Sequence, residues 1–239
     1  MVLKRHHRNW ETIMISVLFL ALTGCITGNG EIASELRDID GFSAVEVISN
    51  IPVDVFVDDE VSVEVTCDSN LIDYIRTEVR GDALQVKTPN NRNVRPTTDC
   101  FVTVTGPTFT EFALSGSAGL YAQGPLKELR ELSASGSGSM LVEAIDSSRL
   151  SVSLSGSGDA ELDGATGDLE LHLSGSGGVL ARDLTAGDAE VKISGSGSAE
   201  ITATGSVDAD LSGSGSLDIY GDPQSVNQDT SGSGDVNVH

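Results

Sequence analysis

Carboxylates recur at one position of a repeat in the second half of the chain, and they are the residues best placed to do chemistry. The tetrapeptide Ser-Gly-Ser-Gly returns there at a nearly constant interval, and in several repeats the fourth residue before it is acidic. These acidic residues are Glu131, Glu170, Glu190 and Asp208, while Ser151 and Asn227 hold the same position in other repeats. A column of carboxylates could hold a hard cation such as Ca²⁺ or serve an enzyme that degrades a polysaccharide.

The same column is also what a hydrated outer surface would show. Like charges stacked at strand spacing repel one another, and exposed carboxylates are screened by salt within about 10 Å. The Ca²⁺-binding nonapeptide GGxGxDxUx is not matched, because Asp follows the tetrapeptide only at Asp159 and Asp235. We therefore predict an acidic column without a metal ion, and we predict no cofactor.

Nucleophilic catalysis lacks its usual partners in this sequence. Beyond the first 25 residues the histidines are His172 and the terminal His239, and no cysteine lies within the repeats. Ser/His/Asp and Cys/His arrangements are therefore nearly excluded. We predict that the protein is not an enzyme, with a polysaccharide-degrading enzyme that uses the carboxylate column as the open alternative.

The first residues of the chain have the pattern of an export signal. Three basic residues, Lys4, Arg5 and Arg8, precede an uncharged run over residues 12–23. Such a run is typical of a secretory signal and is too short to span a bilayer as a helix. We therefore predict a signal peptide over residues 1–24 and a mature protein that is not transmembrane.

A lipid site is predicted where this signal ends. The segment Leu22-Thr23-Gly24-Cys25 resembles the bacterial lipobox, in which the cysteine carries the lipid. Several acyl chains on Cys25 would anchor the protein while its polypeptide stays in water. Residue Ile26, in place of Asp, favours the outer membrane, and residues 25–34 are predicted to form a tether. A chance cysteine after an ordinary signal peptide remains the alternative.

Two further cysteines, Cys67 and Cys100, would lie outside the cytoplasm, where disulfides persist. A bridge between them is the preferred interpretation, and its loop of about 33 residues would stabilise the fold by about 3–4 kcal/mol in the chain-entropy model. Two buried free thiols remain the alternative, because a sequence does not show whether the two Cβ atoms meet. A cysteine-based metal site is disfavoured, since there is no CxxC spacing and no nearby histidine.

The repeat that carries the acidic column also predicts the fold. Apolar and polar residues alternate on both sides of each tetrapeptide, as at Val152 and Leu154, so each repeat holds two short strands. A fixed period of about 20 residues, with turn residues between strands, predicts an all-β parallel β-helix, or β-solenoid, with one coil per repeat. The tetrapeptides begin at Ser115, Ser135, Ser155, Ser174, Ser194, Ser212 and Ser231.

The tetrapeptides should form the corners of this solenoid. We expect glycine to give the backbone freedom at each corner, serine hydroxyls to form ladders from coil to coil, and small aliphatic residues to fill a narrow interior. Flexible linkers are the competing interpretation, but linkers do not recur in register with strands. The last repeat ends at His239 without a polar cap, so we predict that a partner, such as a second copy of the chain, covers this end.

The section before the first tetrapeptide is also predicted to be mainly β. Alternating apolar residues mark strands between Phe42 and Phe101, a helical turn is expected within residues 70–77, and a polar loop within residues 89–99. Most of the aromatic residues lie here, which suggests a bulkier unit that caps one end of the solenoid. The predicted domain is continuous over residues 35–239, with an N-terminal β section over 35–114 and the repeat solenoid over 115–239.

Several segments together resemble one bacterial family. They are the lipobox, the segment from Arg37 to Val47, the run from Asn70 to Ile75, and the repeated tetrapeptides. Over residues 35–238 their joint pattern resembles the putative auto-transporter adhesins with a head GIN domain. The resemblance implies a β-solenoid and a cell-envelope location, and the family has no catalytic residues to carry over.

The net charge of the chain excludes some classes of binding partner. The formal net charge of −22 at pH 7 would repel nucleic acid and anionic membrane surfaces, so membrane contact is predicted through the lipid anchor alone. We predict an exported, lipid-anchored protein of the outer membrane whose rigid, acidic solenoid binds an extended polysaccharide or an envelope protein. A homo-oligomer through the C-terminal coil and a purely structural role in the envelope are further possibilities.

Overall fold

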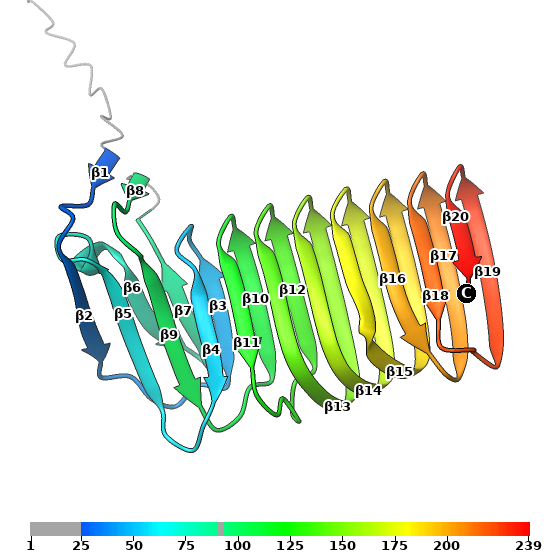
Figure 1. Cartoon of the computed structure of the whole chain (residues 1–239), viewed down its shortest axis with the longest axis horizontal. Helices are drawn as coiled ribbons and strands as arrows, with labels where there is room; N and C mark the ends of the chain where they lie inside the picture. Colours follow the sequence, from blue (N-terminus) through cyan, green and yellow to red (C-terminus); the bar gives the residue numbers. More distant parts are fainter. Residues whose placement is uncertain (1–24, 90–92) are drawn as a thin grey trace, which may run out of the picture.

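The computed structural model describes residues 25–89 and 93–239, and the signal peptide predicted over residues 1–24 lies outside them. The described chain forms a rod of stacked strands, with its N-terminal section at one end and its C-terminus at the other (Figure 1). Within the described residues the helical element is a short 3-10 turn, η1 (Ile72–Tyr74). It lies inside the segment where the sequence predicts a helical turn.

The strands fall into two groups. The first group, before the tetrapeptides, comprises β1 (Cys25–Thr27), β2 (Ile32–Arg37), β3 (Ala44–Ile48), β4 (Val53–Val57), β5 (Ser62–Asp68), β6 (Arg76–Arg80), β7 (Ala83–Lys87), β8 (Asn93–Arg95) and β9 (Phe101–Gly106). The second group comprises β10 (Glu111–Gly116), β11 (Gly119–Gln123), β12 (Glu131–Gly136), β13 (Ser139–Gly156), β14 (Asp159–Gly175), β15 (Gly178–Gly195), β16 (Ser198–Ala203), β17 (Ser206–Gly213), β18 (Ser216–Tyr220), β19 (Ser225–Gly232) and β20 (Asp235–Val238).

Successive coils of the second group stack in parallel and in register. The serines that open the tetrapeptides pair in order, from Ser115 with Ser135 to Ser212 with Ser231. The strands that follow the corners pair in parallel as well. The prediction of an all-β parallel solenoid with coils of about 20 residues is therefore confirmed.

Each coil has two long faces that meet at a Ser-Gly corner. The first face holds strands that run into the corners, such as β10, β12 and β17, and the second face holds strands that leave them, such as β11, β16 and β18. The long strands β13, β14 and β15 contribute to both faces. Inward residues of the two faces are buried against each other, as Val152 and Leu162 illustrate, and they form the predicted interior of small aliphatic side chains.

Gly156 shows why the corner needs glycine. Its φ angle is +121°, and a Cβ atom added there would lie 2.4 Å from the carbonyl oxygen of Gly136 in the preceding coil. Backbone hydrogen bonds join the corners, because Ser157 N–H donates to this same oxygen at 2.9 Å. The predicted ladder of serine hydroxyls is mostly wrong. At the described corners, hydroxyl groups meet only at Ser135 and Ser115, 3.5 Å apart.

The stacking extends into the N-terminal section, but not in chain order. Strands β3 and β4 stack in parallel on β10 and β11. On their other side, β3 pairs in parallel with β7, and β4 pairs in parallel with β9. Beyond them β6 pairs antiparallel with β7, β5 with β9, and β2 with β5. The N-terminal section therefore continues the solenoid and then closes its end, and parallel stacking begins well before residue 115.

Residues 25–34, which the sequence predicts to form a tether, are bound to the rod along their backbone. Strand β1 pairs in parallel with β8, and the N–H of Gly28 donates to the carbonyl of Arg95 at 2.9 Å. The N–H of Gly30 donates to Oδ1 of Asp68 at 2.7 Å, and β2 then pairs with β5. Acceptors far along the chain thus bind the backbone of this polar segment and hold Cys25 next to the rod.

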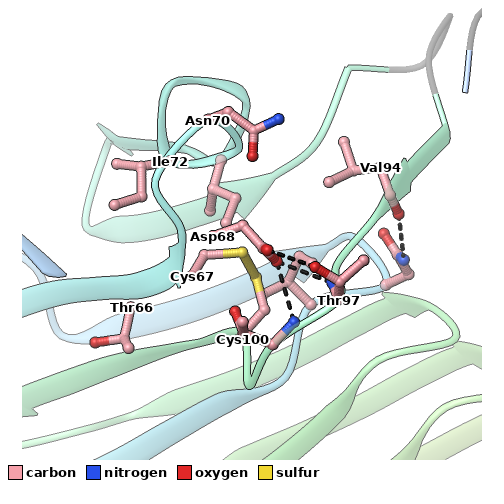
Figure 2. Close-up of a disulfide and its surroundings, with 12 residues drawn as sticks. Thr66, Cys67, Asp68, Asn70, Ile72, Val94, Thr97 and Cys100 are labelled. Carbon is pink, nitrogen blue, oxygen red and sulfur yellow. Dashed lines mark hydrogen bonds between the residues drawn. A yellow bond between two sulfur atoms is a disulfide. The ribbon is translucent and has the colours of Figure 1, made fainter. Parts of the chain in front are cut away.

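A disulfide joins Cys67 and Cys100 in this region (Figure 2). Cys67 lies on β5, and Cys100 directly precedes β9, its antiparallel neighbour. The pairing of Thr66 with Phe101 places the two cysteines next to each other across the strands. Among the described residues the free cysteine is Cys25, and it is exposed.

Asp68, next to the bridge, ties three segments together. Its side chain is fully buried and accepts hydrogen bonds from the N–H groups of Gly30, Thr97 and Thr98 and from the hydroxyl of Thr97. Figure 2 shows its carboxylate directed toward Thr97. Burial by itself would raise the pKa of Asp68, but the hydrogen bonds outweigh it and hold the pKa far below its usual value.

Asp68→Asn is expected to lower the melting temperature at neutral pH, because an amide nitrogen would then face backbone donors. Since the folded pKa of Asp68 is lowered, its contribution is fully present above the unfolded pKa of about 3.9 and is lost as the pH falls below that value. The melting temperatures of the two proteins should differ most above about pH 5 and less toward lower pH. Circular dichroism melts measure this, with exposed Asp73→Asn as control. A constant difference across the pH range would contradict it.

The last coil, which the sequence predicts to end without a polar cap, carries polar residues at part of this end. Gln228 and Thr230 on β19 take the inward positions that Ala209 and Leu211 hold on β17. Polar side chains therefore face the end of the rod at these two positions, and both are exposed. On the second face Val238 remains apolar and is 56% exposed. Pairing of two copies through this coil stays a prediction.

Candidate binding surfaces

The predicted acidic column lies in register on the outer side of the first face. Its members, from coil to coil, are Glu131, Ser151, Glu170, Glu190 and Asp208. Glu111 pairs with Glu131 and extends the column toward the N-terminal section. Burial and the charge of Glu131 raise the pKa of Glu111. The sequence-based column omitted Glu111, although it also stands four residues before a tetrapeptide.

Basic side chains neutralise part of this column. Arg149 Nη2 lies 3.2 Å from Glu170 Oε2, and Lys192 Nζ lies 2.5 Å from Glu190 Oε1. The hydrogen bond and charge of Lys192 hold the pKa of Glu190 below its usual value. Over residues 25–89 and 93–239, no three or more His, Cys, Asp or Glu side chains form a group suited to a metal ion. The column is therefore a partly paired outer surface.

The histidines of the described chain contact carboxylates. Nε2 of His172 lies 3.6 Å from Oε1 of Glu170. The ring of His239 stacks on Tyr220, with the ring centroids 4.6 Å apart, and Nε2 of His239 is hydrogen-bonded to Asp218 at 2.7 Å. These contacts join neighbouring residues and coils, and in the described structure neither ring is hydrogen-bonded to a serine.

A groove runs along the outer side of the second face, away from the acidic column. It has a volume of about 640 Å³ and crosses β4, β11, β13, β14, β15 and β16. These strands are successive neighbours in the middle of the rod (Figure 1). Five strand spacings of about 4.8 Å make the groove roughly 24 Å long.

Two rows of outward residues shape this groove. The first residue after each tetrapeptide is small at Gly119, Ser139 and Gly178, and a Cβ atom added at Gly119 would meet nothing within 4 Å. Two residues further along each strand, the row carries the larger side chains of Leu141 and Leu180, of which Leu180 is 49% exposed. The groove forms because the row of small residues lies lower than the row of large side chains beside it.

Tyr121 forms one wall of the groove and is held from two sides. Its hydroxyl donates to Glu143 Oε2 at 2.7 Å, and Phe56 lies edge-on to its ring with the centroids 6.2 Å apart. The hydrogen bond to Glu143 raises the pKa of Tyr121, and burial adds to this effect. The Tyr121 ring is thereby fixed as an apolar surface whose polar end already has a partner.

Carboxylates are the charged groups of the groove. Asp54, Asp159 and Glu161 line it, and among the described residues no Lys, Arg or His does. Oδ1 of Asp159 accepts the N–H of Gly178 at 2.8 Å. Asp54 and Glu161 have no hydrogen bond or ion pair within the described part of the chain, and burial raises the pKa of Asp54. The groove therefore combines apolar walls with unneutralised acidic groups.

The sequence did not point to this groove. The signal that could have done so is the third residue after each tetrapeptide, where Tyr121, Leu141 and Leu180 replace the polar residues expected on an outer face. The residue at this position changes from coil to coil, with Glu161 between Leu141 and Leu180, so the position does not stand out as a repeat. Their common role depends on the register between coils.

Comparisons with known proteins agree with this fold. Residues 41–223 match the family described as "Putative auto-transporter adhesin, head GIN domain". A crystal structure of a putative adhesin from Bacteroides fragilis has a TM-score of 0.85 at 21% identity, with 90% of this chain and 100% of that chain covered. A crystal structure of a putative lipid binding protein from Parabacteroides distasonis has a TM-score of 0.76 at 26% identity, and one of a putative adhesin from Parabacteroides merdae has a TM-score of 0.72 at 26% identity. Both cover 90% of this chain and 99% of their own. The comparison with curated proteins found no match.

Proposed function

Because the chain belongs to the family of putative auto-transporter adhesins with a head GIN domain, we propose that it is a binding protein of the cell envelope. In this proposal the solenoid is a rigid, non-enzymatic scaffold that presents the groove of its second face to an extended partner, either a polysaccharide or a protein. The acidic column of the first face is then a solvated surface.

The groove is the observation that carries this proposal. Ligand sites are usually concave, with volumes of about 300–1,000 Å³, and have apolar walls with a few polar groups. The groove has this size and this lining, and it follows the axis of the rod. An elongated partner could therefore contact several coils at once.

The alternatives have less support. Polysaccharide cleavage by the column would need carboxylates free to exchange protons, whereas Glu170 and Glu190 pair with Arg149 and Lys192. A purely structural envelope role would not require a groove. Lipid binding is suggested by the name of the P. distasonis relative, and the apolar walls of the groove would suit a lipid chain. The carboxylates of the groove, however, disfavour an anionic lipid head group.

We further propose that Cys25 carries the lipid that attaches the protein to the membrane. Cys25 is exposed, and in the described residues no helix is long and apolar enough to cross a membrane. Because residues 25–34 are bound to the rod, the anchor would hold the N-terminal end of the solenoid close to the bilayer. Outer-membrane placement is part of this proposal.

Cys25→Ser should move the protein almost completely from the membrane fraction to the soluble fraction, because the acyl chains provide the attachment. Fractionation followed by immunoblotting measures this, and Thr27→Ser should remain with the membrane. Retention of Cys25→Ser in the membrane fraction would contradict the proposed anchor.

The binding proposal is tested with glycan and envelope-protein arrays. The purified protein should bind at least one extended ligand, and Leu141→Ser/Leu180→Ser should reduce that signal about tenfold, because both side chains line the groove. The matched control Glu170→Gln/Glu190→Gln changes the opposite face and should retain the signal. Absence of any ligand, or equal binding by the groove variant, would contradict the proposal.

A further inference from the structure

We propose that the occupant of the groove is an extended polypeptide segment that presents both Lys or Arg residues and apolar residues to the groove. This inference rests on the proposed function and specifies its partner. It follows from the charge of the groove, the arrangement of its apolar residues and its length.

Charge selects a cationic partner. Asp54, Asp159 and Glu161 bring negative charge into the groove, and no basic side chain lines it within the part of the chain that the structure describes. Burial raises the pKa of Asp54, so its carboxylate is incompletely hydrated and gains from a nearby cation. Ammonium or guanidinium groups satisfy these carboxylates, whereas phosphates, uronic acids and fatty-acid carboxylates are repelled.

The apolar residues select a partner with apolar side chains. Along the groove, Tyr121 and Leu141 are neighbours, Glu161 follows, and Leu180 comes next. Glu161 therefore lies between apolar side chains along the axis, so the occupant needs both cationic and apolar side chains. A neutral polysaccharide would find only one aromatic ring, Tyr121, for stacking, and the hydroxyl of this ring is already bound to Glu143.

The length of the groove matches a short peptide. A groove of roughly 24 Å accommodates about seven extended residues at about 3.3 Å per residue. The groove lies on the face of the sheet, and its strands are paired on both sides. Recognition therefore uses side chains and not the addition of a strand, so the types of the side chains matter more than the peptide backbone.

The probe is a fluorescently labelled peptide of eight residues in which two Lys residues and then two Leu residues follow each other twice, because this pattern places both types on each face of an extended chain. Fluorescence anisotropy with the purified protein in about 0.15 M salt should show saturable binding, which limits the contribution of long-range charge. Asp54→Asn/Glu161→Gln should weaken binding about tenfold, and Leu141→Ser/Leu180→Ser by a similar factor. A peptide with Glu in place of Lys should not bind.

Matched controls separate the groove from the overall charge. Glu170→Gln/Glu190→Gln removes the same number of charges from the opposite face, and Ile32→Ser/Leu36→Ser removes exposed apolar residues outside the groove. Both should change the affinity less than about twofold. Thermal melts establish that each variant is folded, which is expected because none of the replaced side chains belongs to the buried core.

Three results would overturn the inference. If Glu170→Gln/Glu190→Gln weakened peptide binding as much as Asp54→Asn/Glu161→Gln, the peptide would be attracted by the net charge only. No binding of the Lys-Leu peptide, together with groove-dependent binding of a neutral oligosaccharide or of a phosphatidylcholine vesicle, would replace the peptide by another ligand and leave the proposed function intact. Peptide binding that no groove substitution weakens would place the site elsewhere. The array experiment decides the proposed function independently, because it does not use this peptide.

Discussion

Gly156→Ala is expected to lower the free energy of unfolding by about 3 kcal/mol or more, which is a large effect for the addition of one methyl group. At φ +121° an L side chain is strained by about 1–3 kcal/mol. The added Cβ atom would also lie 2.4 Å from the carbonyl oxygen of Gly136, an oxygen that accepts the hydrogen bond of Ser157. The neighbouring coils would have to separate, so the cost extends beyond the substituted residue.

Thermal and chemical unfolding followed by circular dichroism measure this effect. Gly119→Ala is the control, because a Cβ atom there meets nothing within 4 Å and its φ angle is outside the left-handed region. The control should be neutral or slightly stabilising, by about 0.4–1 kcal/mol. Equal stability of Gly156→Ala and the wild type would contradict the close stacking of the corners.

Removing the disulfide should produce the second large effect. Cys67→Ala/Cys100→Ala opens a loop with a sequence separation of 33 residues, and we expect a loss of about 3–4 kcal/mol in the free energy of unfolding. The loss should concentrate at the N-terminal end, where the bridge joins β5 and β9 next to Asp68. Hydrogen exchange should therefore become faster in these strands than in β14 or β15.

Guanidinium titrations of the oxidised, reduced and double-variant proteins measure the loss. Cys25→Ser is the matched control, since Cys25 has no disulfide partner in the described structure. Reduction of the wild-type protein should give the stability of the double variant. If reduction leaves the unfolding midpoint unchanged, the bridge does not stabilise this end of the rod.

The repeats made much of the fold predictable. Because the tetrapeptides and the alternating residues around them return at one interval, a single coil specifies its neighbours, and the acidic column follows from counting positions. Glu131 and Glu190 therefore lie in the column that the sequence predicts. Ser151 and Glu170 lie between them, and Asp208 follows Glu190. The column was predictable as a geometric feature even though its pairing with basic residues was not.

Features that depend on contacts between distant segments were not predictable. The binding of residues 25–34 to the rod requires Asp68 and Arg95, which nothing in the local sequence connects to that segment. The coil formed by β3 and β4 lies between strands that come later in the sequence, with β7 on one side of β3 and β10 on the other. The order of the coils along the rod therefore differs from their order in the sequence. The groove likewise arises from unlike residues, such as Tyr121 and Leu180, that only the register brings into one surface.

Engineered disulfides between groove positions test the in-register stacking on which both the scaffold and the groove depend. Glu161 and Leu180 are direct partners in adjacent coils, so their Cα atoms should lie about 4.8 Å apart, within bridging range. Leu141 and Leu180 are two coils apart, roughly 10 Å, which exceeds that range. Mass spectrometry after mild oxidation should find a cross-link in Glu161→Cys/Leu180→Cys and none in Leu141→Cys/Leu180→Cys. No cross-link in the first pair, or an equal yield in both, would contradict the stacked solenoid.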